Sequence, residues 1–271
     1  MKDQSGKRAA GGFVAGSTIG ALGGLIGLGG AEFRLPVLKG IFHLQTLEAV
    51  IFNKAMSLIV VTVALLARSV TILPAELLDY WPIALNLLAG SLIGAWLAAG
   101  SASRMHAKTL DYVVFALLVG LAVLMVVQHL AHPGPTTEPL LDEGVVRWIA
   151  GLVAGLGIGA IAAFLGVAGG ELLIPTITLL YGVDVRLAGS LSLAISLPTM
   201  LVGMLRYTQS NRFSVLRREG GLFAGMGLGS VVGAGIGGLA IGLVAPDWLI
   251  LLLAAILLVS AWKAFADARS A

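Results

Sequence analysis

Two opposite charges, Glu32 and Arg34, stand two residues apart inside a long apolar tract of the chain. A glycine pair precedes them and a proline follows, and both residue types disfavour an unbroken helix. We therefore expect one helix to end near residues 27–30 and a new helix to begin near residues 31–36. Such a break leaves backbone N–H groups unpaired and directs the positive end of the new helix at the gap, where a small anion can bind.

The same pattern recurs 139 residues further along the chain. The stretch "GFVAGSTIGALGGLIGLGGAEFRLP" (12–36) aligns without a gap with "GLVAGLGIGAIAAFLGVAGGELLIP" (151–175), and "GSLIGA" (90–95) aligns with "GSVVGA" (229–234) in the same register. Chance does not keep one register over such a distance, so we interpret the chain as a duplication. The second break, near residues 166–170, then supplies a second positive helix end, and the two facing ends form an anion cradle.

Polar residues on the next apolar segment of each half add candidate ligands. Asn53, Lys54 and Ser57 lie in the first copy, and Ser192 and Ser196 occupy matching positions in the second. Residues four apart share one face of a helix, and we expect these faces to point into the bundle. Interhelical hydrogen bonding alone is the alternative role for the three serines, and snorkelling to the membrane interface is the alternative for Lys54.

The predicted substrate site combines these side chains with the backbone of the two breaks. Leu173 takes the place of Arg34 in the second copy, so Arg34 is either a substrate-side cation or a structural partner of Glu32. Glu32 and Glu171 are equivalent, and they are predicted either to carry a coupling proton or to cap the new helices. The substrate-binding set is Arg34, Asn53, Lys54, Ser57, Ser192, Ser196, Gly29, Gly30, Ala31, Ala168, Gly169 and Gly170.

No catalytic, metal or cofactor site is predicted from the residue types. The chain has no cysteine, and its four histidines share no ligand spacing. The glycines of "GLGGAE" lack the spacing of a dinucleotide-binding turn, and no nucleophile and base stand in a recognisable pattern. We therefore expect neither an enzyme nor a nucleic-acid-binding protein.

The elements that must position the candidate ligands are membrane helices. Only 11% of the residues are charged and 58% are hydrophobic, with a mean hydropathy of +0.98, so the lipid bilayer is the expected solvent. Each half has about five apolar segments, several of them near the ~20 residues that cross the hydrocarbon core. The segments 35–47 and 172–183 are too short to cross upright, which leaves a full crossing and a re-entrant pair as the two interpretations.

The basic residues predict which loops face the cytoplasm. They gather near both termini and near 103–108 and 206–219, whereas the segments near 76–79 and 138–143 are acidic or poor in lysine and arginine. The positive-inside rule then places both termini in the cytoplasm. The first half begins inside and the second begins outside, which predicts inverted repeats related by a pseudo-two-fold axis in the membrane plane.

The predicted fold is an all-α polytopic membrane protein made of two inverted-topology repeats, with helices broken near the bilayer midplane. Its parts are a first repeat (1–131), an extracytoplasmic linker (132–144) that contains "HPGPTTEP", and a second repeat (145–271). Apolar segments continue after the first one, so a cleaved signal peptide is not expected. Glycines at every fourth position of 12–20 and 225–237 are predicted to form flat stripes where helices pack closely.

The doubled "G-x-x-G-x-E-x-x-x-P" break, the "NK…S" or "S…S" segment and the "G-S-x-x-G-A" helix together resemble the TauE/SafE family of sulfite exporters. This family is also called the 4-toluene sulfonate uptake permease family, and the resemblance covers nearly the whole chain. It implies proton-linked secondary transport, often outward, of sulfite, sulfoacetate or other organosulfonates across a bacterial inner membrane. Arg34 matches no general motif of the family. A passive anion channel and a non-transporting membrane scaffold are the alternatives.

Overall fold

The computed structural model describes residues 2–26, 30–68, 78–131 and 139–239, and in these residues it contains helices and no strand. Four of the helices are long and apolar enough to cross a membrane, which confirms the predicted class of a helical membrane protein. The helices are α1 (Lys2–Ile26), α2 (Ala31–Gly40), α3 (Thr46–Arg68), α5 (Trp81–Arg104), α6 (Ala107–Ala131), α7 (Val145–Leu165), α8 (Gly170–Tyr181), α9 (Val185–Tyr207), the 3-10 helix η1 (Asn211–Ser214), α10 (Val215–Arg218) and α11 (Gly220–Leu239).

Both predicted helix breaks are present. α1 ends at Ile26, and α2 begins directly after Gly30, whose φ is 69°. α7 ends at Leu165, and α8 begins directly after Gly169, whose φ is 85°. This left-handed backbone favours glycine because a Cβ atom would be strained there. The glycines that suggested the breaks in the sequence therefore have a local steric role at both of them.

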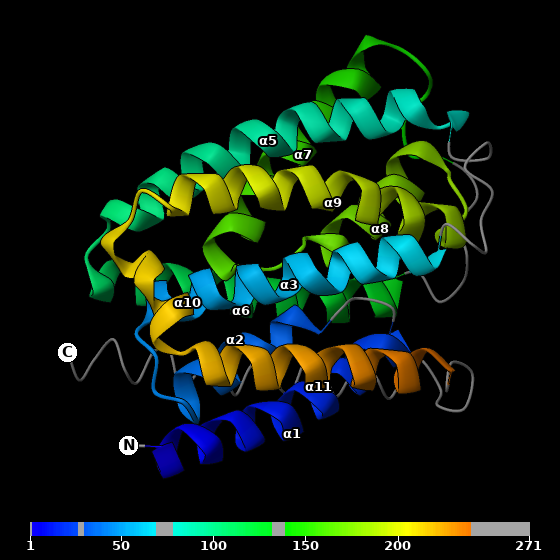
Figure 1. Cartoon of the computed structure of the whole chain (residues 1–271). Helices are drawn as coiled ribbons and strands as arrows, with labels where there is room; N and C mark the ends of the chain where they lie inside the picture. The colour runs from blue at the N-terminus through cyan, green and yellow to red at the C-terminus, as the bar shows by residue number, and fades with distance from the viewer. Residues whose placement is uncertain (1, 27–29, 69–77, 132–138, 240–271) are drawn as a thin grey trace.

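The short helices α2 and α8 are re-entrant. Arg8, near the start of α1, donates a 3.3 Å hydrogen bond from Nη2 to the backbone oxygen of Phe42, just beyond the end of α2. In the second half, the guanidinium of Arg147 near the start of α7 lies 5.8 Å from the ring centre of Tyr181, the last residue of α8. Each short helix thus returns to the end of the bundle at which the preceding long helix began (Figure 1).

The helix bounds follow the duplication. A shift of 139 residues carries α3 (Thr46–Arg68) onto α9 (Val185–Tyr207) and the first residue of α5 onto the first residue of α11. The colour gradient in Figure 1 shows that α3 and α9 run in opposite directions, as do α5 and α11. The segment equivalent to α6 begins beyond residue 239, outside the described residues.

The helices that pack most closely on each other come from different halves of the chain. α1 lies along α11 and α5 lies along α7, and both pairs are parallel (Figure 1). A methyl group added at Gly16 would overlap the backbone oxygen of Met226, and one added at the equivalent Gly155 would overlap that of Leu87, the equivalent of Met226. The same exchange relates three further sets of contacts: Gly20 to Ser230 with Gly159 to Ser91, Gly229 to Phe13 with Gly90 to Leu152, and Gly233 to Ser17 with Gly94 to Leu156. Each of these contacts between α1 and α11 thus has a counterpart between α5 and α7 at positions shifted by 139 residues.

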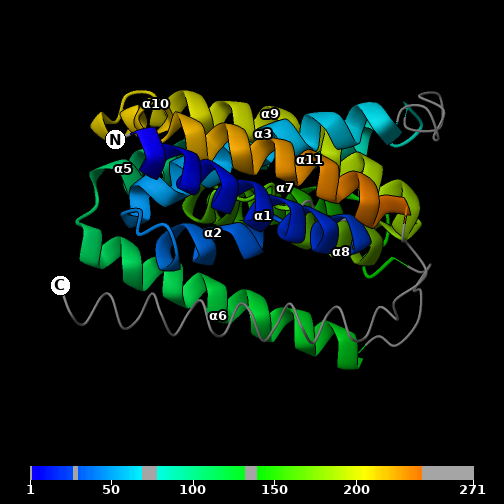
Figure 2. The same cartoon turned by 60° about the horizontal axis from the view of Figure 1, so that its bottom comes forward.

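The glycines from Gly12 to Gly20 and from Gly225 to Gly233 therefore have the predicted packing role, since an added Cβ at each would press on the facing helix. The surroundings of Gly237, the last glycine of the second stripe, lie outside what the structure describes. α6 lies along one edge of the bundle next to α2 (Figure 2). A 2.5 Å ion pair between Lys39 of α2 and Asp111 of α6 holds the two together, and Thr46 also contacts Asp111.

The two ends of the bundle differ in charge. The start of α1, the turn between α5 and α6, and η1 with α10 lie together at one end, on the left of Figure 1, which we call the basic end. Residues 78–80 and 139–144 lie at the opposite end, which we call the linker end. The loops that the sequence assigns to one side of the membrane thus share one end of the molecule.

Candidate functional site

Arg34 is completely buried, and its guanidinium lies against the polar face of α3. Nη1 donates hydrogen bonds of 3.2 Å to Oδ1 of Asn53 and to Oγ of Ser57. A guanidinium stays protonated in proteins, and burying its charge is costly unless it is hydrogen-bonded. The fold therefore brings three of the predicted substrate-binding residues into one buried group, which we call the Arg34 cluster.

Asn53 connects the two helix breaks. Its side-chain Nδ2 donates to the backbone oxygen of Ala31, at the start of α2, at 3.0 Å. The same nitrogen donates to the backbone oxygen of Leu165, the last residue of α7, at 3.1 Å. With Oδ1 accepting from Arg34, this amide group forms three hydrogen bonds. It thereby holds the break of one copy against the break of the other.

The C-terminal end of α7 has its carbonyl groups bound by side chains of other helices. The helix closes with a Schellman-type turn, in which the N–H groups of Val167 and Gly166 donate to Ala162 and Ala163 at 3.1 and 3.2 Å. Four side chains then donate to the carbonyl oxygens of this turn: Lys54 to Ala162 (3.1 Å), Tyr207 to Ala163 (3.1 Å), Asn53 to Leu165 (3.1 Å) and Ser57 to Gly166 (3.4 Å). The helix end carries partial negative charge, so the ammonium of Lys54 is well placed there.

Lys54 does not snorkel to an interface, which was the alternative to a role inside the bundle. The residue is 0% exposed, and a methyl group added at Gly203 of α9 would lie 2.8 Å from its Cε atom. The glycine leaves room for the lysine stem between α3 and α9. The ammonium therefore stays inside the bundle, where the α7 carbonyl group replaces the water that an interface would supply.

The equivalent face of α9 forms fewer bonds. Ser192 donates only along its own helix, to the oxygen of Gly189 at 2.9 Å. Ser196 is 1% exposed, and its Oγ has no hydrogen-bond partner among the described residues. Both serines are buried inside the bundle, as predicted, and the Oγ of Ser192 lies 3.7 Å from the Cβ position of Gly170, at the start of α8.

Glu171 also faces the protein interior at the start of α8. The residue is 6% exposed, and its Oε1 has no hydrogen-bond partner within the described part of the chain. This oxygen therefore does not cap the helix. Ala168 and Gly169 are buried beside it, and Gly169 has no side chain that could cap the N–H groups of α8. Within the described residues, the start of α8 thus combines a helix end without a side-chain cap and one buried carboxyl oxygen without a hydrogen-bond partner.

Two predicted residues lie outside the described part of the chain in whole or in part. Gly29 falls in the undescribed segment 27–29, and Glu32 is described as part of α2 but its side chain is not. Gly30 and Ala31, in contrast, are buried at the start of α2. The Ala31 carbonyl contributes to the Arg34 cluster through Asn53.

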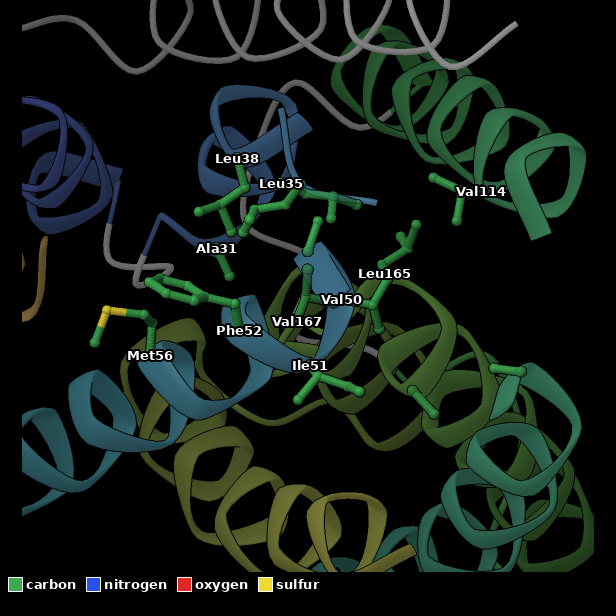
Figure 3. Close-up of a cluster of buried hydrophobic side chains, with 14 of the residues drawn as sticks. Ala31, Leu35, Leu38, Val50, Ile51, Phe52, Met56, Val114, Leu165 and Val167 are labelled. Atoms are coloured by element: carbon green, nitrogen blue, oxygen red, sulfur yellow. The ribbon is translucent and has the colours of Figure 1, made fainter. Parts of the chain in front are cut away.

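Buried apolar side chains come from the same helices as the Arg34 cluster. Figure 3 shows Leu35 of α2, Val50 of α3, and Leu165 and Val167 of the second break lying close together. All four side chains are buried. A low-dielectric surrounding strengthens each hydrogen bond of the cluster and each interaction with a bound charge.

Within the described residues, no three potential ligands from His, Cys, Asp or Glu come together as a metal site.

One comparison with known proteins identifies the family of the chain. A family model described as sulfite exporter TauE/SafE matches residues 12–264, which include both breaks and every predicted site residue. The chain belongs to the sulfite exporter TauE/SafE family. No curated protein and no solved structure matches it. TauE/SafE membership confirms the resemblance found in the motifs and identifies a membrane transport protein of a sulfite-exporter family.

Proposed function

We propose that this TauE/SafE protein is a secondary transporter that exports a small sulfur-containing anion, such as sulfite, sulfoacetate or another organosulfonate, from the bacterial cytoplasm. The observation that carries the proposal is the Arg34 cluster, a buried cation positioned where the two helix breaks meet. Intramembrane cations are costly, and they usually mark a substrate path.

The chemistry of the cluster suits a sulfur oxyanion. A guanidinium presents its N–H groups in a planar fork that matches two oxygens of one oxyanion. The oxygens of Asn53 and Ser57 that now accept from Nη1 are neutral, and an anionic oxygen is the stronger acceptor. A substrate oxygen is thus expected to replace one of them, while Lys54, Ser192, Ser196 and the uncapped start of α8 complete the site.

Inverted repeats supply the alternating access that such a carrier needs. The opposite directions of α3 and α9 and the reciprocal glycine contacts support a two-fold axis that runs across the helices, hence in the membrane plane. We place the repeats at 1–131 and 145–271, joined by an extracytoplasmic linker at 132–144. The positive-inside rule puts the basic end and both termini in the cytoplasm of the bacterial cell.

Glu171 is the proposed carrier of the coupling proton, together with its equivalent Glu32. Its Oε1 atom is buried and has no hydrogen-bond partner among the described residues, so a proton bound to this carboxyl group would remove a charge that burial penalises. Binding and release of this proton next to the start of α8 would change the charge that the substrate meets there.

Purified protein in liposomes tests the proposal. We expect saturable flux of labelled sulfite or sulfonate that an imposed pH gradient drives, and loss of this flux in Arg34→Gln. Glu171→Gln should retain anion exchange but lose the response to the gradient, whereas Arg104→Gln, an exposed cation at the basic end, should behave as wild type. Flux that neither saturates nor depends on protons would favour a passive channel, and the absence of flux under either gradient would contradict transport.

A thermal-shift panel separates binding from transport. A ligand that binds only the folded protein raises its melting temperature by mass action. We expect one of the small sulfur oxyanions to raise the melting temperature of wild type and to have a smaller effect on Lys54→Ala. A panel in which no oxyanion shifts the wild type would instead favour a non-transporting scaffold.

A further inference from the structure

A cavity of about 380 Å³ opens at the linker end, away from the Arg34 cluster. It is enclosed by the start of α5, the start of α7 and the end of α8. Its walls are fixed by Asn86, whose Nδ2 donates at 3.0 Å both to the hydroxyl of Tyr181 and to the backbone oxygen of Trp148. The function proposed above does not use this cavity.

Arg147 places a cation in the cavity wall. Its side chain is 13% exposed, and its guanidinium is held over the ring of Tyr181. Its carboxylate partner, at 3.0 Å, is Glu143, four residues earlier, just before α7 begins, and 93% exposed. Ion pairs with an exposed partner are weak, so an incoming anion can displace Glu143 at little cost.

The basic end shows what fits in front of such an arginine. The duplication makes Arg8 the equivalent of Arg147 and Phe42 the equivalent of Tyr181. At the basic end, the Arg8 guanidinium donates to the Phe42 backbone and forms a 3.1 Å ion pair with Glu219. The equivalent of Glu219 is Tyr80, which lines the cavity and has no carboxylate to offer. The acid that pairs with Arg8 thus has no counterpart at position 80, and the acid that pairs with Arg147 is instead the exposed Glu143.

The geometry points to a second anion-binding site in the linker-end cavity, where Arg147 binds a small monoanionic oxyanion such as an alkylsulfonate in the place that the Glu219 carboxylate takes beside Arg8. Asp79 and Glu143 also line the cavity, and both residues are exposed. Their charges disfavour a dianion such as sulfate, which sets the preference for a single negative charge. Binding here does not require that the chain transport anything.

A cysteine at the cavity lining tests the site locally, because the chain has no cysteine of its own. Asp79→Cys is to be modified by two thiosulfonate reagents, one that bears a sulfonate and one that bears a quaternary ammonium, with the rates followed by mass spectrometry. We expect Arg147→Gln to slow the sulfonate reagent about tenfold relative to the ammonium reagent, since the sulfonate then loses a charge-assisted hydrogen bond. Methanesulfonate should protect this cysteine, and Arg147→Gln should remove the protection.

Asp142→Cys is the matched control, since Asp142 is an exposed aspartate at the same end of the bundle but does not line the cavity. An equal effect of Arg147→Gln at both cysteines would overturn the site, because it would reflect the general field of the arginine. Glu143→Gln provides a second arm that leaves Arg147 in place. Removing the competing carboxylate should improve protection by methanesulfonate about twofold, in line with the strength of an exposed ion pair, and no improvement would also overturn the proposal. Liposome flux is read separately, so a failure of transport leaves this outcome intact.

Discussion

α3 and α9 occupy equivalent positions in the two halves, but their polar faces bond differently. In α3, Asn53, Lys54 and Ser57 all donate to the end of α7. In α9, Ser192 bonds within its own helix and Ser196 has no partner in the described residues. The two helices therefore share equivalent bounds but differ in the hydrogen bonds that their polar side chains form. The first copy braces the second break, whereas the two serines of the second copy form no such bond to a break within the described residues.

The largest expected effect tests the backbone that the two copies share. Gly16→Ala and Gly155→Ala each place a methyl group against a backbone oxygen of the facing helix, so the helices must separate. We expect each change to lower the stability by about 3 kcal/mol, the upper part of the range for overpacking. Thermal unfolding in detergent, followed by circular dichroism, measures both variants.

Gly157→Ala is the control for these two variants, because nothing lies within 4 Å of its added methyl group. Alanine is the better helix former, so this variant should gain up to about 1 kcal/mol. A marked loss in Gly16→Ala without one in Gly155→Ala would mean that the two packing seams are not equivalent.

A smaller effect should separate the two polar faces. Asn53→Ala removes three hydrogen bonds and leaves buried groups of both breaks without this partner. We expect a loss of about 2 kcal/mol, within the range for buried groups left unsatisfied. Ser192→Ala at the equivalent position should cost less than about 0.5 kcal/mol, since its bond returns to its own helix. Equal losses in the two variants would remove the contrast between the copies.

The two ends of the bundle should differ by a smaller margin again. Arg218 holds Glu48 through two hydrogen bonds, of 2.8 and 3.2 Å, and this contact raises the pKa of the arginine. Glu48→Gln should cost about 1 kcal/mol, the upper value for a partly exposed ion pair with good geometry. Glu143→Gln at the linker end should change the unfolding free energy by less than about 0.5 kcal/mol. Chemical unfolding of both variants in the same detergent compares the two ends directly.

The smallest expected effect comes from a variant that introduces a hydrogen bond which is present at only one of two equivalent positions. Ser91 and Thr199 form a 2.7 Å hydrogen bond, whereas the equivalent Ser230 has no partner in the described residues. The helix of Ser230 packs on α3, which carries Val60, the equivalent of Thr199. Val60→Thr should give Ser230 that partner and raise the stability by about 0.6 kcal/mol, a typical value between membrane helices. Thr199→Val should lose a similar amount. A destabilised Val60→Thr variant would show that the duplication does not extend to this pair.

The parts of the structure that follow from local chemistry were predictable from the sequence. Glycine at positive φ and proline inside a short helix mark both breaks, and spacing by four residues places Asn53 and Ser57 on one buried face. The partners were not predictable. Lys54 bonds to a carbonyl group 108 residues away, and Tyr207 was not singled out, because no residue pattern announces which distant side chain will reach the end of α7. Tertiary packing decides such contacts, whereas local backbone rules decide only that a helix must end.

The glycine contacts between α1 and α11 and between α5 and α7 have the same geometry, but the ribosome makes the partners of the two pairs at very different intervals. Gly155 lies 68 residues after its neighbour Leu87, whereas Met226 is made 210 residues after its neighbour Gly16. Chains grow from the N-terminus at about 5–20 residues per second, and early parts fold first. Helices α5 and α7 can therefore pack together during translation. The glycine face of α1, in contrast, contacts lipid until α11 has been inserted. An insertion chaperone that shields newly made membrane segments would be needed most by the first helix of this protein.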